Sequence, residues 1–123
     1  MLFNTCVIIA VLIGGPVDDK PLTFPAIVSW YGLSGSEMAN GQIFDKDNKH
    51  LAAHKTLPLG TKVRLTNQNT STKVSLVVEI TDRGPFIKGR DFDVSESAAR
   101  HLGFLDQGVV QLKVEILFRP ASR

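Results

Sequence analysis

Asp82 is the residue whose type and surroundings best suit acid–base chemistry. Four apolar residues precede it at a spacing of two, namely Val74, Leu76, Val78 and Ile80. This spacing predicts a strand with these side chains, and that of Asp82, on its core-facing side. A carboxyl group at the end of an apolar row loses hydration, which favours the protonated form that a general acid needs. The pattern alone favours a plainer interpretation, in which Asp82 accepts hydrogen bonds from the backbone of the turn after it.

His54 is a second candidate for proton chemistry, because an imidazole can orient a carboxylate or shuttle a proton. It lies in a stretch of small and apolar residues, 51–58. A lone histidine is more often a structural hydrogen-bonding group. His50 precedes it by four residues, but that spacing makes a metal pair only on a helix. The strand and loop character predicted here therefore argues against a bound metal.

Asp91 and Asp93 flank Phe92 on a predicted short strand, so both carboxylates are expected to point away from the Phe92 side. Two interpretations are open: a solvated face, or ion pairs with the nearby basic residues Arg83, Lys88 and Arg90.

Period-two patterns elsewhere predict a mainly β fold, with strands over 27–31, 62–66, 73–81 and 109–118. Trp30 and Tyr31 fall on opposite faces of the first strand. Only one of them can lie in the core, and the other is free to stack on a sugar ring.

One short helix is predicted between Ser95, a favourable N-cap residue, and Gly103, which can adopt the left-handed conformation that ends a helix. Its buried side is expected to consist of Ala98, Ala99 and Leu102.

The N-terminal residues 1–15 are uncharged and contain an apolar run too short to span a bilayer, which suits the apolar part of a signal peptide. Residues 16–25 mix prolines with charges and are predicted to be a linker. The folded domain is expected over 26–119, with a tail at 120–123. We expect export to the bacterial periplasm or cell envelope. A lipid anchor is not expected, because Cys6 precedes the apolar run rather than following it.

Composition describes one compact domain, with 123 residues of which 43% are hydrophobic. The formal net charge of +2 comes from dispersed basic residues, so nucleic acid is not an expected partner. Cys6 is the only cysteine, which excludes an intramolecular disulfide and a thiolate metal cluster.

Several motifs in order make the chain resemble the rare-lipoprotein-A (RlpA) domain, over about Val28 to Leu117. The motifs are Ser29-Trp30-Tyr31-Gly32, Ala39-Asn40-Gly41-Gln42-Ile43-Phe44-Asp45, Ala52-Ala53-His54-Lys55-Thr56-Leu57-Pro58-Leu59-Gly60-Thr61, Val63-Arg64-Leu65-Thr66-Asn67, Asp82-Arg83-Gly84-Pro85-Phe86, Asp93-Val94-Ser95, Ala98-Ala99 and Leu102-Gly103.

The resemblance implies a six-stranded double-psi β-barrel with one short helix, a fold shared with expansins. It also implies an endolytic lytic transglycosylase that cleaves peptidoglycan between N-acetylmuramic acid and N-acetylglucosamine and leaves a 1,6-anhydro ring. Carried over by residue, Asp82 is the proposed acid and then base, and His54 is its hydrogen-bonding partner. The remaining predicted site residues, which contact substrate or hold the loop, are Tyr31, Gln42, Asp45, Arg83 and Asp93.

Gln42 departs from the family pattern, which commonly has a glutamate at this position. An amide can hydrogen-bond a sugar but cannot exchange a proton usefully. If Asp82 alone transfers protons, activity survives this change. The alternatives are a non-catalytic, expansin-like module that binds wall glycan, and a partner-binding scaffold. No cofactor and no metal are expected, and the chain is expected to be a monomer.

Overall fold

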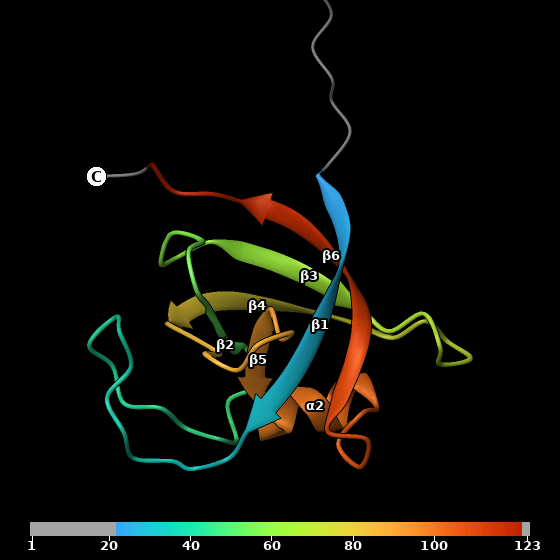
Figure 1. The fold of residues 1–123 in the computed structure, drawn as a ribbon, viewed down its shortest axis with the longest axis horizontal. Helices are drawn as coiled ribbons and strands as arrows, with labels where there is room; N and C mark the ends of the chain where they lie inside the picture. Colours follow the sequence, from blue (N-terminus) through green and yellow to red (C-terminus); the bar gives the residue numbers. More distant parts are fainter. Residues whose placement is uncertain (1–21, 122–123) are drawn as a thin grey trace, which may run out of the picture.

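The computed structural model describes residues 22–121, which form six β-strands and one helix (Figure 1). In chain order they are β1 Thr23–Tyr31, β2 Leu51–His54, β3 Lys62–Thr66, β4 Ser75–Asp82, β5 Phe92–Ser95, α2 Glu96–Leu102 and β6 Val109–Phe118.

The strands close into a single barrel in the order β1-β5-β2-β4-β3-β6. Two neighbouring pairs, β1 with β5 and β2 with β4, run parallel, and the other four pairs are antiparallel. The prediction of a mainly β, six-stranded barrel with one short helix is confirmed. Parallel pairing needs crossover connections, so strands distant in the sequence lie side by side.

β1 begins at Thr23, three residues before the predicted start of the domain. Residues 23–25 were placed in a linker that was predicted from the prolines and charges of residues 16–21, yet they pair with β6 in register, from Thr23 opposite Glu115 to Pro25 opposite Lys113. The proposed signal-like segment 1–15 and most of the linker lie outside the described residues.

α2 confirms the predicted helix and its caps. The Ser95 side chain accepts a hydrogen bond from the Ala98 backbone N–H at 3.2 Å, and Gly103 adopts φ +80° at the other end. Ala98, Ala99 and Leu102 are fully buried against the barrel, as their spacing predicted.

The barrel interior holds the main core, built from inward-facing apolar residues of all six strands and from α2. A second, smaller core cluster lies outside the barrel wall and consists of Met38, Phe44 and Leu51, with Tyr31 packed against it. Met38 and Phe44 belong to the long connection between β1 and β2, which runs along one side of the barrel (Figure 1), and Leu51 is the first residue of β2. Within residues 22–121, no helix has the length and apolar character needed to cross a membrane.

Candidate functional site

The side chain of Asp82 lies on the outer face of the barrel, because β4 contains an irregularity just before it. Ala52 of β2 pairs with Ile80, and the next residue, Ala53, pairs with Asp82 rather than with Thr81. One extra residue of this kind is a β-bulge, which turns the following side chain to the other face. The prediction that Asp82 continues the core-facing row of Leu76, Val78 and Ile80 is therefore wrong.

Asp93 lies on the same outer face and next to Asp82 across β2. Ala53 pairs with Asp82 on one side and with Asp93 on the other, and Asp93 pairs with Ser29 of β1. Paired residues in a sheet project their side chains to the same face. Asp93 accepts a short hydrogen bond from the Ser29 hydroxyl, and Ser29 is itself almost fully buried.

These residues line a pocket of about 270 Å³ together with Tyr31, Arg83 and the loop after it. Its full lining is Tyr31, Ala53, Asp82, Arg83, Gly84, Pro85, Phe86, Ile87 and Asp93. The Tyr31 hydroxyl is buried and has no hydrogen-bond partner among the described residues. Burial raises the pKa of Tyr31 strongly, and the negative charges of Asp82 and Asp93 raise it further. The hydroxyl therefore lies within electrostatic range of both carboxylates.

The two carboxyl groups of the pocket have different environments. Asp82 Oδ1 accepts hydrogen bonds from two backbone N–H groups, that of Ala39 at 2.9 Å and that of Arg83 at 2.8 Å. The bond from Arg83 agrees with the plainer interpretation of Asp82 as a turn residue. Burial raises the pKa of Asp93, against the opposing effects of the Ser29 hydrogen bond and the charge of Arg90.

His54 does not hydrogen-bond Asp82, contrary to the expected partnership. It pairs with Phe92 in β5, and the two rings lie 4.6 Å apart on the inner side of the sheet. Its Nδ1 atom accepts hydrogen bonds from the backbone N–H groups of Thr56, at 3.1 Å, and Leu57, at 3.0 Å. The bulge in β4 sends Asp82 outward while His54 faces inward, so the sheet separates the two side chains.

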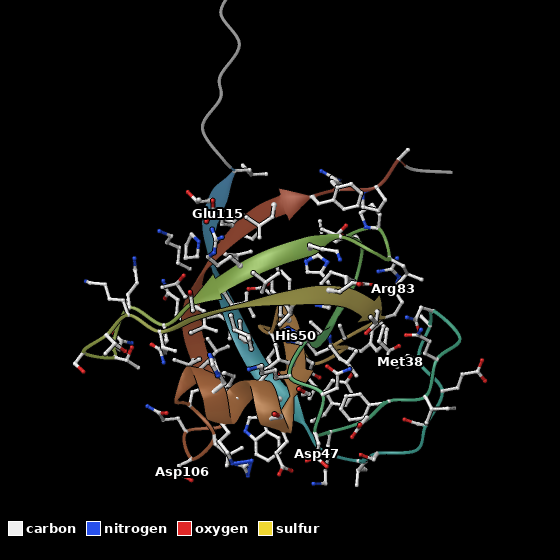
Figure 2. All side chains as sticks on the ribbon, turned by 180° about the vertical axis from the view of Figure 1, so that it is seen from behind. Met38, Asp47, His50, Arg83, Asp106 and Glu115 are labelled. Carbon is white, nitrogen blue, oxygen red and sulfur yellow. The ribbon has the colours of Figure 1, made fainter. Side chains whose placement is uncertain are left out.

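Arg83 links the His54 turn to the pocket. Its guanidinium donates to the carbonyl oxygens of His54, at 3.0 Å, and Leu57, at 2.7 Å. Arg83 directly follows Asp82 and lies near Met38, on the side of the barrel that carries the β1–β2 connection (Figure 2). His54 is therefore connected to this pocket residue through its backbone carbonyl.

Gln42 lies near the site without lining the pocket. Its side chain accepts a hydrogen bond from the Asn40 side chain at 3.1 Å, within a tight turn that also includes Met38. The turn is fixed to β4 because the Asn40 backbone N–H donates to the Thr81 carbonyl at 3.1 Å. This backbone, rather than the Gln42 side chain, contacts Asp82.

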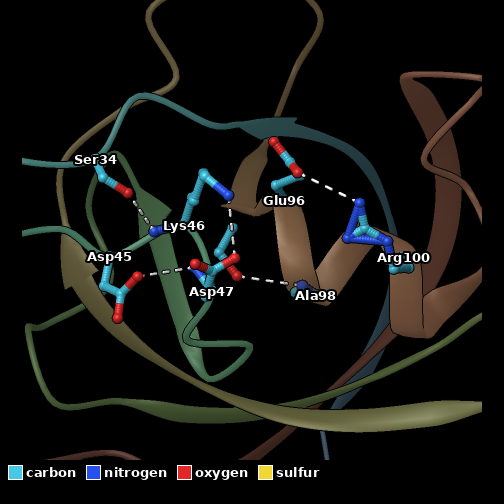
Figure 3. Close-up of polar contacts among 8 residues, drawn as sticks. Ser34, Asp45, Lys46, Asp47, Glu96, Ala98 and Arg100 are labelled. Atoms are coloured by element: carbon cyan, nitrogen blue, oxygen red, sulfur yellow. Dashed lines mark hydrogen bonds and ion pairs between the residues drawn. The ribbon is translucent and has the colours of Figure 1, made fainter.

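Asp45 is not brought to the pocket. Its carboxylate accepts a hydrogen bond from the Asp47 backbone N–H at 3.0 Å, in a network that also includes Ser34 and Lys46 (Figure 3). The Ser97 backbone N–H of α2 donates to the Lys46 carbonyl at 3.0 Å. The Asp45 carboxylate thus forms a local turn in the connection, next to the Lys46 carbonyl that contacts α2.

The aromatic side chains divide as the alternation of β1 predicted. Trp30 packs on the main core and donates from Nε1 to the Leu105 carbonyl at 3.0 Å. Tyr31 stacks on Phe44, with ring centroids 4.1 Å apart, so one face of its ring is occupied although the residue lines the pocket. Asp91 forms no ion pair among the described residues and instead accepts a hydrogen bond from the Ile27 backbone N–H at 2.8 Å.

Three pocket features were missed from the sequence: Ser29, the Ala39 backbone and the apolar rim formed by Phe86 and Ile87. The Phe86 side chain is 80% exposed. Ser29 could have been found from its spacing, because it shares a face with Tyr31 two residues later. The hydrogen bond from the Ala39 backbone to Asp82 joins residues 43 apart in the chain, so no local sequence pattern predicts it.

A larger hollow of about 490 Å³ lies between β1, β6 and the turn after β3, but Lys113 is its only charged lining residue and it has no carboxylate or histidine. Within residues 22–121, no three His, Cys, Asp or Glu side chains gather in a way that could hold a metal ion. The smaller pocket, which is lined by Asp82 and Asp93, is therefore the candidate site.

The barrel belongs to the double-psi β-barrel class, as its solved neighbours show. The Streptomyces papain inhibitor superposes with a TM-score of 0.63 at 21% identity, covering 79% of this chain and 96% of that protein. An expansin of Clavibacter michiganensis in complex with cellohexaose superposes with a TM-score of 0.61 at 18% identity, covering 83% and 54%.

The chain belongs to the lytic transglycolase family, whose model matches residues 24–114. A relative from Nostoc sp., named probable endolytic peptidoglycan transglycosylase RlpA, is 44% identical over 102 residues, which cover 80% of this chain and 27% of the relative. The endolytic peptidoglycan transglycosylase RlpA of Pasteurella multocida is 45% identical over 93 residues, covering 74% and 31%. The chain thus spans about a third of these relatives, and the resemblance to the RlpA family is confirmed.

Proposed function

We propose that this domain cleaves the glycan strands of peptidoglycan as an endolytic lytic transglycosylase. The bond between N-acetylmuramic acid and N-acetylglucosamine breaks, and the muramoyl C6 hydroxyl closes a 1,6-anhydro ring. The observation that carries the proposal is the convergence of Asp82, Asp93 and the buried Tyr31 hydroxyl in one pocket on the outer face of the barrel. Acid–base catalysis needs carboxyl groups next to a space that a glycosidic oxygen can enter.

The pocket suits a sugar chain in two further respects. Phe86 and Ile87 present exposed apolar surface at its rim, on which the apolar face of a pyranose ring can rest. Tyr31 and Arg83 supply hydrogen-bond donors at the pocket wall. In this proposal the domain needs no cofactor or metal and acts as a monomer.

The test is digestion of purified glycan strands, with mass spectrometry of the soluble products. Wild type should release fragments with 1,6-anhydro ends, and Asp82→Asn should reduce their release by about 100-fold or more, the usual scale of a lost acid–base group. Equal release by wild type and Asp82→Asn would exclude the role of Asp82.

A wall-binding module without turnover is the second candidate, favoured by Gln42, whose amide stands where the family commonly has a carboxylate. The same assay separates the two. Sedimentation with insoluble peptidoglycan and no soluble product would identify a binding module.

We also propose that the protein is exported to the cell envelope, because peptidoglycan lies outside the cytoplasm. N-terminal sequencing of the exported protein tests this, and an intact N-terminus on protein that remains in the cytoplasm would exclude it.

A further inference from the structure

The pocket contains a second carboxyl group, that of Asp93, which lies on the other side of β2 from Asp82 at the same level of the sheet. Asp82 and Asp93 come from different strands, β4 and β5, and both pair with Ala53 of the strand between them. Directly opposed residues in a sheet have Cβ atoms about 5 Å apart, so two such steps across Ala53 leave room for one sugar linkage between the carboxyl groups. The Tyr31 hydroxyl, from β1, completes the group.

We propose that Asp93 is the general acid of this site and that Asp82 is the base, so that the two carboxyl groups divide the work assigned above to one. This inference rests on the proposed function and names the residue that gives the first proton. It replaces His54, which faces the barrel interior, as the partner of Asp82.

The hydrogen bonds of the two groups support this division. Asp82 accepts two backbone N–H groups on Oδ1, and Oδ2, for which no hydrogen bond is found among the described residues, is the atom that can receive a proton. Asp93 receives one hydroxyl bond, from Ser29, on a sheet face covered by the β1–β2 connection. Burial raises the pKa of Asp93, and Ser29 and Arg90 oppose that rise. Pairs of carboxyl groups with such different environments are the usual basis of separate acid and base roles.

The reaction balances without water or a cofactor. Asp93 gives its proton to the glycosidic oxygen, the bond from the muramoyl C1 to that oxygen breaks, and its electron pair stays on the oxygen, which becomes the C4 hydroxyl of N-acetylglucosamine. The muramoyl C6 oxygen bonds to C1 and its proton passes to Asp82. Exchange with solvent then returns a proton to Asp93 and removes one from Asp82. The charged and titratable groups around Asp93 are Asp82, Tyr31, Arg83 and Arg90.

The first experiment compares Asp93→Asn with the matched variant Asp91→Asn in the release of 1,6-anhydro ends. Asparagine keeps an oxygen that can accept the Ser29 hydrogen bond, so the fold should persist, which thermal melting checks. Asp93→Asn should lose about 100-fold or more of the rate while still sedimenting with peptidoglycan. Asp91 is two residues away and outside the pocket lining, and Asp91→Asn should release anhydro ends near the wild-type rate.

The second experiment uses Ser29→Ala and the pH dependence of the rate. Removing the Ser29 hydrogen bond removes an interaction that favours ionised Asp93, so the pKa of the acid should rise and the high-pH limb of the profile should move to higher pH. A merely structural Asp93 would lower the rate without moving that limb. Full activity of Asp93→Asn, or an unmoved limb in Ser29→Ala, overturns the inference alone, whereas a wild type that releases no anhydro ends overturns the proposed function itself.

Discussion

The imidazole of His54 must be neutral in the folded protein, because its Nδ1 atom accepts two backbone hydrogen bonds and cannot also carry a proton. Burial lowers the pKa of His54, and the charges of Arg83 and Lys55 lower it further, against the opposing charge of Asp91. The folded protein therefore binds this proton less readily than the unfolded chain does. Neutral His54 stabilises the turn at Thr56 and Leu57, and protonation of its Nδ1 atom would remove both hydrogen bonds.

The consequence for stability has a definite sign. As the pH falls below the ordinary histidine pKa of about 6.5, the unfolded chain gains the proton first and the free energy of unfolding decreases. We expect wild type to lose more thermal stability than His54→Gln between pH 7.5 and pH 5. Melting both proteins at the two pH values measures this difference, which isolates His54 from other groups that titrate in the range. An equal loss in both proteins would contradict this account of His54.

Residue types in the sequence predicted which residues line the pocket better than they predicted which of these residues contact one another. Asp82, Tyr31, Arg83 and Asp93 were predicted, and they line one pocket. The period-two pattern runs unbroken through Asp82, so nothing local marks the bulge that turns its side chain outward. The partnership with His54 came from the resemblance alone, and the side chains face opposite sides of the sheet.

The β1–β2 connection is the element that shapes the pocket from outside. Phe44 is buried and stacks on Tyr31, while its backbone exchanges hydrogen bonds with Ser36 and Gly35. The Ala39 N–H that holds Asp82 belongs to the same connection. This connection has its own small core, so it can loosen without unfolding the barrel.

We therefore expect Phe44→Leu to weaken the connection more than the barrel, because the leucine cannot stack on Tyr31. Amide hydrogen exchange should speed up over residues 35–44, with little change in β3 and β4. The rate of glycan cleavage should fall because Tyr31 and Ala39 are less firmly placed. Uniformly faster exchange across the barrel would show that the connection and the barrel form one cooperative unit.

Elements that depend on local sequence patterns were predicted more closely than those that depend on pairing between distant parts of the chain. β3, β6 and the caps of α2 follow from local alternation and capping residues, and their positions were predicted closely. β1 was predicted from the alternation that starts at Ile27, whereas the segment before it, from Thr23, also pairs with β6. The insertion of β5 between β1 and β2 depends on a parallel pairing with β1 and an antiparallel pairing with β2, both over long sequence separations that no local pattern encodes.

On the scale of the whole molecule, each strand of the closed barrel is paired on both sides, and the start of β1 lies beside the last residues of β6. Thr23 pairs with Glu115, and the Ile116 N–H donates to the Leu22 carbonyl at 3.0 Å. A short linker can therefore join the end of β6 to the start of β1 without disturbing a strand.

A circular permutant with that linker and new ends between Ser71 and Thr72, both exposed, should keep the barrel and most of the activity. A second permutant with its new ends between Gly35 and Ser36 should have lower activity while the barrel persists, because the β1–β2 connection is cut. Circular dichroism and the anhydro-end assay report the two properties separately. Failure of the first permutant to fold would show that the turn after β3 is needed for folding.

The pairing of the start of β1 with β6 also determines where a segment or partner attached to either strand end lies relative to the pocket. Tyr31 and Thr23 stand at opposite ends of β1, about 26 Å apart at about 3.3 Å per residue. A group attached near Thr23 would lie at the opposite end of β1 from Tyr31, which lines the pocket that contains Asp82 and Asp93. If the proposed glycan cleavage is correct, a group attached at that end of β1 need not obstruct the pocket.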